Sequence, residues 1–475
     1  MSKSKSKKNK NEIIISEGGS SKGNLTLPKY IASVINIPTT IKSIFEYDPT
    51  IKFSSNIDYP LFSLGFQFYI HGTKKEANVL EKFEGKKKVY YVMNEFEKNV
   101  DNYDENIGEV TKKFLKTDVV SREFFKLWEM LFMFDLIDLD NNKFVSVHIA
   151  EGPGSFIQAT NLFRETFGKS NIAKNDKYYT VTLNSQNKDD YVPEIDKKLI
   201  SHHEKDSPKR LFIHKTYSTQ VAGGLKDKDN GDITDPKTIK LFGGEIKEKA
   251  DFITADGGFK WKEEHLQEQE AFNLILAEIC TAIKMQKKGG SFICKFFETF
   301  TLTSTKFISM LASVYNKVFI VKPLMSRPSN SEKYLVCLDF KYAESDKHLK
   351  DIIKSIDTLL KTAHENKNKK INDIFPDYKV SPVVLSHLIQ INREVANKQF
   401  KSINEIVKFV NDQNFFGDVY QEHRLMQIEA SKYWIDTFLP SKDKFKEHKE
   451  KINDISFTSN KMNVEIAVDL SKSLI

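Results

Sequence analysis

Four separated polar residues in this chain have the types and positions expected of a reaction centre. Two are lysines and two are carboxylates, and each lies at the edge of a strand-like or helix-like run: Lys126, Asp256, Lys295 and Glu332. Lys295 interrupts the apolar run SFICKFF, and an isolated lysine in a central strand is costly to bury unless carboxylates pair with it. A lysine held among carboxylates and a second cation can serve as a general base. The structural alternative is a salt-bridge network that ties strand ends together.

Glycine-containing turns provide further candidate sites. EGPGSF, residues 151–156, follows the apolar run FVSVHIA and precedes a helical pattern. Its glycines allow a tight turn with exposed backbone N–H groups, which suits a carboxylate or phosphate at the start of a helix. The segment is not a dinucleotide fingerprint, because Ile157 stands where a third glycine would be needed. A structural turn and a ligand site both stay open here, as they do for Asp232 in GDITDP and for ADGGF.

The elements that position these residues alternate between strands and helices. From about 140 to 342, helical patterns separate short apolar runs: FVSVHIA, YYTVTL, RLFIHK, DFITAD, SFICKFF, VFIVKPL and KYLVCLDF. This alternation predicts an α/β fold with a mainly parallel sheet and helices on both faces. Such sheets bind ligands outside the carboxyl ends of their strands, and each residue singled out above lies at or near such an end.

Two helical patterns bear directly on the candidate residues. Residues 111–139 carry apolar side chains at three-to-four spacing, and Ser121 is the expected N-cap of the segment that holds Lys126. HLQEQEAFNLILAEICTAIKMQKKGG is the clearest helix in the chain. Gly289 and Gly290 are expected to end it.

Composition divides the chain into four predicted parts. Residues 1–20 form a lysine-rich tail that we expect to be disordered, because it cannot bury enough apolar surface to fold. Residues 21–110 mix short extended runs with polar connectors and are expected to form an N-terminal lobe. The α/β domain occupies 111–344, and amphipathic lysine-rich helices at 345–475 predict a helical C-terminal lobe.

The bulk composition limits the class of protein. The 475 residues carry a net charge of +7, of which the tail holds a large part, so the rest of the chain is almost neutral. Three cysteines without CxxC spacing argue for a reducing compartment and against a zinc or disulfide scaffold. No apolar run approaches the length of a membrane span, and we expect a cytoplasmic or nuclear protein that is not secreted. No cluster at ligand spacing predicts a metal.

In their order, these motifs resemble the FtsJ-like (RrmJ-type) 2′-O-ribose methyltransferases. The motifs are SREFFKLWEM, HIAEGPGSFIQA, GDITDPKTI, ADGGF, GGSFICKFFETF and KPLMSRPSNSEKYLVC. Residues 231–337 are especially similar to the cap-specific mRNA methyltransferases of eukaryotes and large DNA viruses. The resemblance implies a Rossmann-like sheet that uses S-adenosylmethionine, with an N-terminal extension and a helical C-terminal lobe.

The resemblance also implies roles for particular residues. The family's catalytic tetrad falls on Lys126, Asp256, Lys295 and Glu332. The methionine part of the cofactor would lie against Gly152, Pro153, Gly154, Ser155 and Phe156, and Asp232 matches an adenine-contacting aspartate. Asn184 departs from the acidic residue that many methyltransferases carry at the end of the second strand. We expect Lys295 to be the base, with its pKa lowered by burial and by Lys126 from the usual value of about 10.4.

The implied reaction is methyl transfer from S-adenosylmethionine to the ribose 2′-hydroxyl of the first transcribed nucleotide of capped mRNA, which converts cap 0 to cap 1. The implied partner is capped single-stranded RNA, with other capping or transcription proteins as further candidates and no membrane. Candidate RNA contacts are basic and aromatic: residues 86–91, Arg327 and Tyr433-Trp434. The alternatives are methylation of ribosomal or transfer RNA, and a non-catalytic RNA-binding subunit. The lysine- and asparagine-rich composition fits an AT-rich genome such as that of a large cytoplasmic DNA virus.

Overall fold

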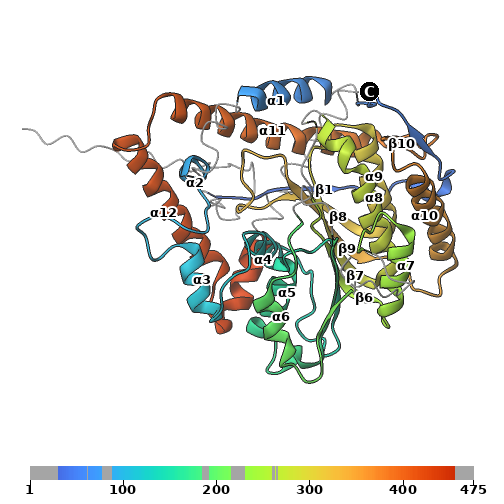
Figure 1. The fold of residues 1–475 in the computed structure, drawn as a ribbon, viewed down its shortest axis with the longest axis horizontal. Coiled ribbons are helices and arrows are strands. Elements are labelled where there is room, and N and C mark those ends of the chain that lie inside the picture. The colour runs from blue at the N-terminus through green and yellow to red at the C-terminus, as the bar shows by residue number, and fades with distance from the viewer. Residues whose placement is uncertain are drawn as a thin grey trace, which may run out of the picture.

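A computed structural model describes residues 30–60, 63–76, 88–184, 192–214, 230–258, 263 and 266–454. The predicted tail at 1–20 lies outside these residues. The described chain builds one large sheet with helices packed on both of its faces, as Figure 1 shows. The predicted Rossmann-like α/β class is therefore confirmed.

The order and direction of the strands decide where the site lies. Across the sheet the strands are β1 (Ser33–Ile37), β8 (Tyr315–Lys322), β9 (Lys333–Phe340), β7 (Gln286–Phe296), β6 (Ala250–Ala255), β3 (Val145–Ile149), β4 (Lys177–Val181) and β5 (Leu211–Ile213). β7, β6, β3, β4 and β5 pair in parallel, whereas β9 is antiparallel to both β7 and β8. Because β9 runs the opposite way, the residue that precedes it lies at the edge where β6 and β7 end.

Helices bury the two faces of the sheet in separate hydrophobic clusters. One face carries α7 (Pro236–Glu245), α8 (Gln267–Met285), α9 (Leu302–Val314) and α10 (Lys347–Glu365), and the other carries α4 (Glu123–Met133), α5 (Ser155–Phe167), α6 (Lys197–Glu204), α3 (Ile107–Leu115) and α12 (Asp418–Phe438). Successive strand residues point to opposite faces. In β6, Phe252 therefore joins one cluster and its neighbour Ile253 the other.

The stretches before and after the central domain extend its sheet and cover it. β1 adds an antiparallel edge strand to β8, and β2 (Ile51–Phe53) pairs with β10 (Ile371–Ile374). In Figure 1, α1 (Leu64–Glu76) lies along the long helix α11 (Pro382–Asn411), and α11 also contacts β1 and α2 (Lys88–Met93). The domain boundaries at 110 and 345 stay predictions, since both flanking stretches pack on the central sheet.

Three local predictions differ from the structure. The predicted helix over 111–139 is two helices, α3 and α4, because the chain turns at Lys116 with φ 56°. Ser121 is not the N-cap residue of α4, which is Arg122. Gly289 and Gly290 do not end the helix: α8 stops at Met285 and β7 begins at once, since the Gln286 side chain donates to Ala250 O across the sheet.

A buried carboxylate holds α1 on the central domain. His71 Nε2 lies 3.0 Å from Glu298 Oε2, and Lys74 Nζ donates to Glu298 Oε1 at 2.6 Å. Burial alone would raise the pKa of Glu298, but the hydrogen bond from His71 and the charge of Lys74 lower it to about 2. The ionised carboxylate therefore stabilises the docked helix.

We predict that acid releases α1. Because the pKa of Glu298 is about 2 in the folded protein, the stabilisation is fully present above the usual value near 4.5 and is lost as pH falls from there toward 2, a change of roughly 3 kcal/mol. The Glu298→Gln variant should lack this stabilisation at neutral pH. Amide hydrogen exchange of residues 64–76 would report the release. Glu46→Gln, at the exposed Lys42–Glu46 pair, is the control, and equal exchange in both variants would contradict the prediction.

Candidate active site

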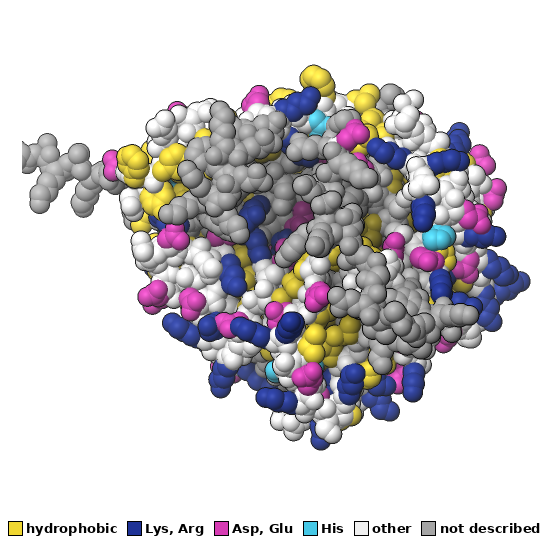
Figure 2. Space-filling view, in the orientation of Figure 1, with side chains coloured by type: hydrophobic (Ala, Val, Ile, Leu, Met, Phe, Trp, Pro, Cys, Tyr) yellow, Lys and Arg dark blue, Asp and Glu magenta, His cyan; other side chains and the backbone are white. Residues whose placement is uncertain are grey.

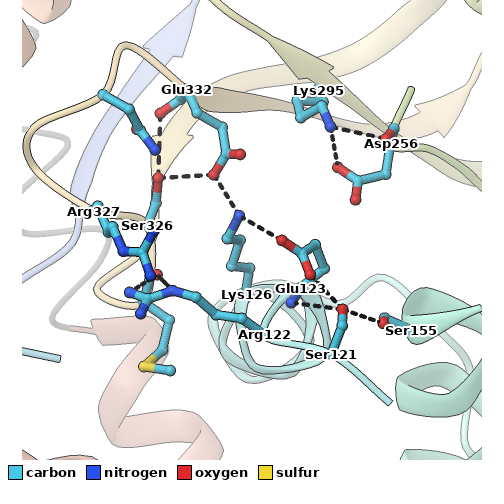
Figure 3. A network of polar contacts seen from close by, with 12 residues as sticks. Ser121, Arg122, Glu123, Lys126, Ser155, Asp256, Lys295, Ser326, Arg327 and Glu332 are labelled. Atoms are coloured by element: carbon cyan, nitrogen blue, oxygen red, sulfur yellow. Dashed lines mark hydrogen bonds and ion pairs between the residues drawn. The ribbon is translucent and has the colours of Figure 1, made fainter. Parts of the chain in front are cut away.

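The four predicted catalytic residues meet at the carboxyl edge of the sheet as two ion pairs. Lys126 Nζ lies 2.8 Å from Glu332 Oε1, and Lys295 Nζ lies 3.2 Å from Asp256 Oδ1. Figure 3 shows both pairs in one view, with Glu123 and Ser326 in contact with the Lys126–Glu332 pair and no contact drawn from that pair to Lys295–Asp256. They come from four elements: α4, the end of β6, β7, and the residue before β9. The structure thus brings together residues that are up to about two hundred positions apart in the sequence.

Packing of α4 fixes the first lysine. Ten consecutive residues of this helix, from Phe124 to Met133, are buried, so the helix cannot rotate without exposing its core side chains. The Lys126 side chain is only 5% exposed and reaches Glu332 on one side and Glu123, at 3.6 Å, on the other. Burial alone would raise the pKa of Glu123, but the charge of Lys126 lowers it below its usual value. Lys126 thus sits between two ionised carboxylates.

The second lysine is held as a protonated ammonium. Lys295 Nζ donates to the backbone oxygen of Asp256 at 2.8 Å in addition to its carboxylate contact. Burial alone would lower the pKa of Lys295, but the charges of Asp256 and Glu332 outweigh burial and raise the pKa above its usual value. This differs from the expectation that burial and Lys126 would lower it. The physical reason is that the carboxylates nearest Lys295 outnumber the cations beside it.

The two carboxylates of the network respond to burial in opposite ways. Burial would raise the pKa of Glu332, yet the charges of Lys126 and Lys295 lower it to about 2. In Asp256, burial wins over the two lysines and raises the pKa. Tyr334, in β9, donates its hydroxyl to Asp256 Oδ1 at 3.2 Å. Glu332 is therefore the more firmly ionised of the two.

A buried glutamate that sequence reasoning missed supports the turn after Asp256. Gly257 N donates to Glu278 Oε1 at 3.1 Å, and a side chain at Gly257 would collide with that oxygen. A side chain at Gly258 would approach Lys295 Nζ to 3.3 Å. The ADGGF motif thus needs its glycines because α8 and β7 crowd the turn. The only sequence signal for Glu278 is an acid among apolar residues of a predicted helix.

A cavity of about 950 Å³ opens beside the Lys295–Asp256 pair. It runs along the carboxyl ends of β3, β4, β6 and β7, where ligands of such sheets bind. Of the predicted cofactor residues, Gly152, Pro153, Ser155 and Asp232 line it. In Figure 2 the face of the molecule is hollowed near its centre, and charged side chains are visible inside the hollow.

Two predicted cofactor residues do not line this cavity. Gly154 has φ 105° and packs so closely on Leu199 that a Cβ would lie 2.6 Å from its Cδ2. Phe156 is fully buried. Both shape the turn behind the cavity wall and do not face the cavity.

Glu151 is a second functional candidate that sequence reasoning missed. Its Oε1 accepts hydrogen bonds from Phe156 N at 2.7 Å and Ile157 N at 3.3 Å. The Glu151 carboxylate therefore occupies some of the backbone N–H groups at the start of α5, which we expected a ligand to bind. Glu151 lines the cavity, and among the described residues its buried Oε2 has no hydrogen-bond partner. Burial and the charge of Asp256 raise its pKa well above the usual value.

The far part of the cavity contains the GDITDP turn. Asp232 Oδ1 accepts from Thr234 N at 2.9 Å and from its hydroxyl at 2.7 Å, while Asp235 caps α7. Asp232 thus shapes a turn and also faces the cavity. Asn184 stands where many methyltransferases carry an acidic residue. Its backbone N–H donates to Asn230 O at 2.7 Å, directly before the same turn.

The residues predicted to contact RNA lie in different surroundings. Trp434 is fully buried and donates to Glu129, and the Tyr433 hydroxyl donates to Tyr30 O, so both aromatics pack within the protein. Arg327 Nε is 3.0 Å from Glu97 Oε1 and remains about one third exposed. Lys86 and Lys87 lie outside the described residues.

Glu129, one helical turn after Lys126, anchors the loop that follows β8. It is fully buried and accepts hydrogen bonds from Leu324 N, Met325 N and the Trp434 indole at 2.7 to 2.9 Å. The next residue in the loop, Ser326, donates to Glu332 Oε1 at 2.9 Å. α4 therefore positions both the lysine and, through this loop, its carboxylate partner. Burial raises the pKa of Glu129 to about 7.

The described residues contain neither a membrane-spanning helix nor a metal-binding cluster. Within the described ranges, no helix has the length and apolar character needed to cross a bilayer. In the same part of the chain, no three His, Cys, Asp or Glu side chains are grouped in a way that could hold a metal ion.

Residues 119–340 match the model of the FtsJ-like methyltransferase family. The chain is 33% identical over 198 residues to the cap-specific mRNA (nucleoside-2′-O-)-methyltransferase 1 of Ailuropoda melanoleuca, a match that covers 40% of this chain and 23% of that protein. It is 27% identical over 310 residues to the protein of the same name from Caenorhabditis elegans, covering 63% and 30%. The chain thus spans less than a third of the length of these relatives.

Similarity to solved structures is weaker. A crystal structure described as a putative ribosomal RNA methyltransferase from Plasmodium falciparum aligns with a TM-score of 0.29 at 22% identity, over 46% of this chain and 97% of that one.

We predict that Glu129 makes stability depend on pH. Its pKa is about 7 when folded, above the usual value near 4.5, so folding favours the protonated acid. Stability should therefore fall as pH rises from 4.5 to 7, by roughly 3 kcal/mol. Urea unfolding of the wild type and of Glu129→Gln at several pH values would isolate this contribution as their difference. A difference that stays constant from pH 5 to pH 8 would contradict the prediction.

Proposed function

We propose that the protein methylates the 2′-hydroxyl of a ribose in RNA, with S-adenosylmethionine as the donor, because residues 119–340 match the FtsJ-like methyltransferase family. The observation that carries the proposal is the Lys295–Asp256 ion pair in the lining of the large cavity, with the Lys126–Glu332 pair at the same edge of the sheet. A structural network would not need to border a cavity of this size. A ribose hydroxyl, in contrast, needs a base at the point where the methyl donor is held.

The residues around the cavity fit the proposed donor. Its volume of about 950 Å³ is ample for a nucleoside-sized ligand. Gly152 and Ser155 would hold the amino-acid part, Asp232 would face the adenine part, and the unpartnered Glu151 Oε2 would accept a hydrogen bond from an ammonium group. When bound, S-adenosylmethionine supplies a methyl group activated by a positively charged sulfur. No metal is needed for that activation.

Lys295 is the base in this proposal. Its raised pKa means that Nζ carries a proton at neutral pH, which it must lose before it can accept one from the ribose hydroxyl. Positive charge entering the cavity destabilises the Lys295 ammonium and lowers its pKa toward neutrality. Asp256 orients Nζ through its carboxylate and backbone oxygens. Lys126, held by Glu332, positions the ribose or an adjoining phosphate.

The substrate we propose is the first transcribed nucleotide of capped mRNA. The relatives that carry the name cap-specific mRNA methyltransferase support this choice over ribosomal or transfer RNA. Capped single-stranded RNA is then the partner, and the protein would work in the cytoplasm or nucleus where such RNA is made.

The function is tested by transfer of a labelled methyl group to short RNAs that differ only in the cap. We expect methylation of N7-methylguanosine-capped RNA at the first ribose and much less of uncapped RNA. Lys295→Ala should lower the rate by about 10²- to 10⁴-fold, because a positioned general base contributes that much. It should still bind the donor, which calorimetry would measure.

Each other outcome rejects a part of the proposal. Equal transfer to capped and uncapped RNA would reject the cap assignment and favour ribosomal or transfer RNA. Binding of RNA without any methyl transfer would indicate a non-catalytic subunit. A folded, active Lys295→Ala variant would reject the role of the base.

We further predict that Glu332→Gln moves the pH–rate profile. Because the charge of Glu332 raises the pKa of Lys295, its removal should shift the rise in rate to lower pH, even though the maximal rate falls as Lys126 loses its partner. Single-turnover rates between pH 6 and pH 10 would show the shift. A profile that keeps its position while the maximum falls would mean that another group titrates.

A further inference from the structure

A second cavity, of about 450 Å³, lies at the same edge of the sheet on the opposite side of the ion pairs. The donor cavity borders the ends of β3, β4, β6 and β7, whereas the second one borders the end of β8 and the start of β1. In the sheet order, β9 lies between these two sets of strands, and Glu332 directly precedes it. The Lys126–Glu332 pair therefore stands between the two cavities, while Asp256 and Lys295 line the donor cavity.

A thin wall separates the second cavity from the Lys126–Glu332 pair. Ser326 lines the cavity and donates its hydroxyl to Glu332 Oε1 at 2.9 Å. Lys322, also in the lining, donates to Ser326 Oγ at 3.1 Å and to Glu332 O at 2.8 Å. A ligand in this cavity would thus lie one side chain away from the catalytic network.

One side of the second cavity is apolar and the other is basic. Half-buried apolar side chains come from three separate segments: Met93, Leu324, Pro328 and Met426. Two lysines on α11, Lys398 and Lys401, also line the cavity, and their side chains are 46% and 79% exposed. Single-stranded nucleic acid is bound in this way, with bases on apolar or aromatic side chains and phosphates on lysines.

The lysines are anchored but keep charge available. Lys398 Nζ donates to Ser33 Oγ at 2.7 Å and to Glu394 Oε1 at 2.9 Å, and Lys401 pairs loosely with Glu405 at 3.8 Å. The lining also holds Glu95, Glu405 and the buried Lys322, whose pKa burial lowers well below its usual value. Lys398 and Lys401 are therefore the exposed lysines of the lining from which a phosphodiester would accept hydrogen bonds.

We propose that this cavity receives the nucleotide on the 3′ side of the methylated ribose, with Lys398 and Lys401 on its phosphate and the apolar wall against its base. The proposal rests on the proposed function, because it takes the ribose to lie at the ion pairs. Most of the lining comes from outside residues 119–340, namely from residues 30–33, 92–96, 398–405 and 423–427. The flanking segments of this chain thus supply the RNA subsite that the methyltransferase domain lacks.

The test is fluorescence anisotropy with a cap dinucleotide and with capped and uncapped RNAs four and eight nucleotides long. The wild type should bind more tightly as the chain lengthens. In Lys398→Ala/Lys401→Ala we expect at least a tenfold loss for the eight-nucleotide RNAs, capped or not, and a loss below twofold for the cap dinucleotide. The slope of log affinity against log salt should become shallower by about 1.4, since each phosphate contact on single strands contributes about 0.7.

The matched control is Lys354→Ala/Lys361→Ala. These lysines on α10 are 79% and 76% exposed and are also paired within their helix. The control removes two lysines, so it changes the net charge by the same amount. Melting temperatures would confirm that both double variants fold. Equal losses of RNA affinity in the two double variants would indicate only the general effect of net charge. An equal loss of affinity for the cap dinucleotide and for the long RNAs would place the cap in this cavity. No loss of affinity would mean that Lys398 and Lys401 face solvent and do not contact RNA. Each of these results overturns the proposal.

Failure of the proposed function gives a different pattern. If the wild type methylates none of the RNAs, the function fails, whereas the dependence of affinity on chain length and on Lys398 and Lys401 can still be measured with uncapped RNA.

Discussion

Burial of four charges at one edge of the sheet is the constraint on which the rest of the site depends. Lys126, Asp256, Lys295 and Glu332 are each at most 14% exposed at the side chain. A buried charge left unpaired is costly, so each lysine must keep its carboxylate within contact distance. Three of the segments that carry these residues are fixed by identifiable contacts. The buried core side chains fix α4, Glu278 fixes the turn after β6, and the loop anchored on Glu129 fixes Glu332.

The same constraint sets the chemistry. The carboxylates that offset the cost of burying Lys295 also raise the pKa of Lys295. The arrangement that stabilises the site therefore opposes the proposed use of Lys295 as a base. Such a site would be inactive until positive charge enters beside it. In the proposed mechanism the ion pairs would do more than hold strand ends together, because they would keep Lys295 protonated until the methyl donor is bound.

The topology places two cavities at one edge of the sheet, where the proposed donor and the proposed RNA chain would bind. β9 runs against its neighbours, which brings Glu332 to the edge where β6 and β7 end, and the strands on either side of these three border separate cavities. Segments before and after the methyltransferase domain close the second cavity. Their packing on the sheet through β1, α2, α11 and α12 gives them a place in the proposed site as well as in the fold.

The fold class, the strands that carry the site and its four charged residues could be predicted from the sequence, because alternating apolar runs and isolated charges at their ends are local patterns. Which lysine pairs with which carboxylate, and the raised pKa of Lys295, became known only from the folded arrangement. It alone revealed Glu129, Glu151 and Glu278, and showed that Gly154 and Phe156 lie behind the cavity wall. It also showed that Gly289 and Gly290 belong to β7, at the irregularity where the register between β6 and β7 shifts. These features depend on burial and on charges brought together from distant segments, which no local pattern records.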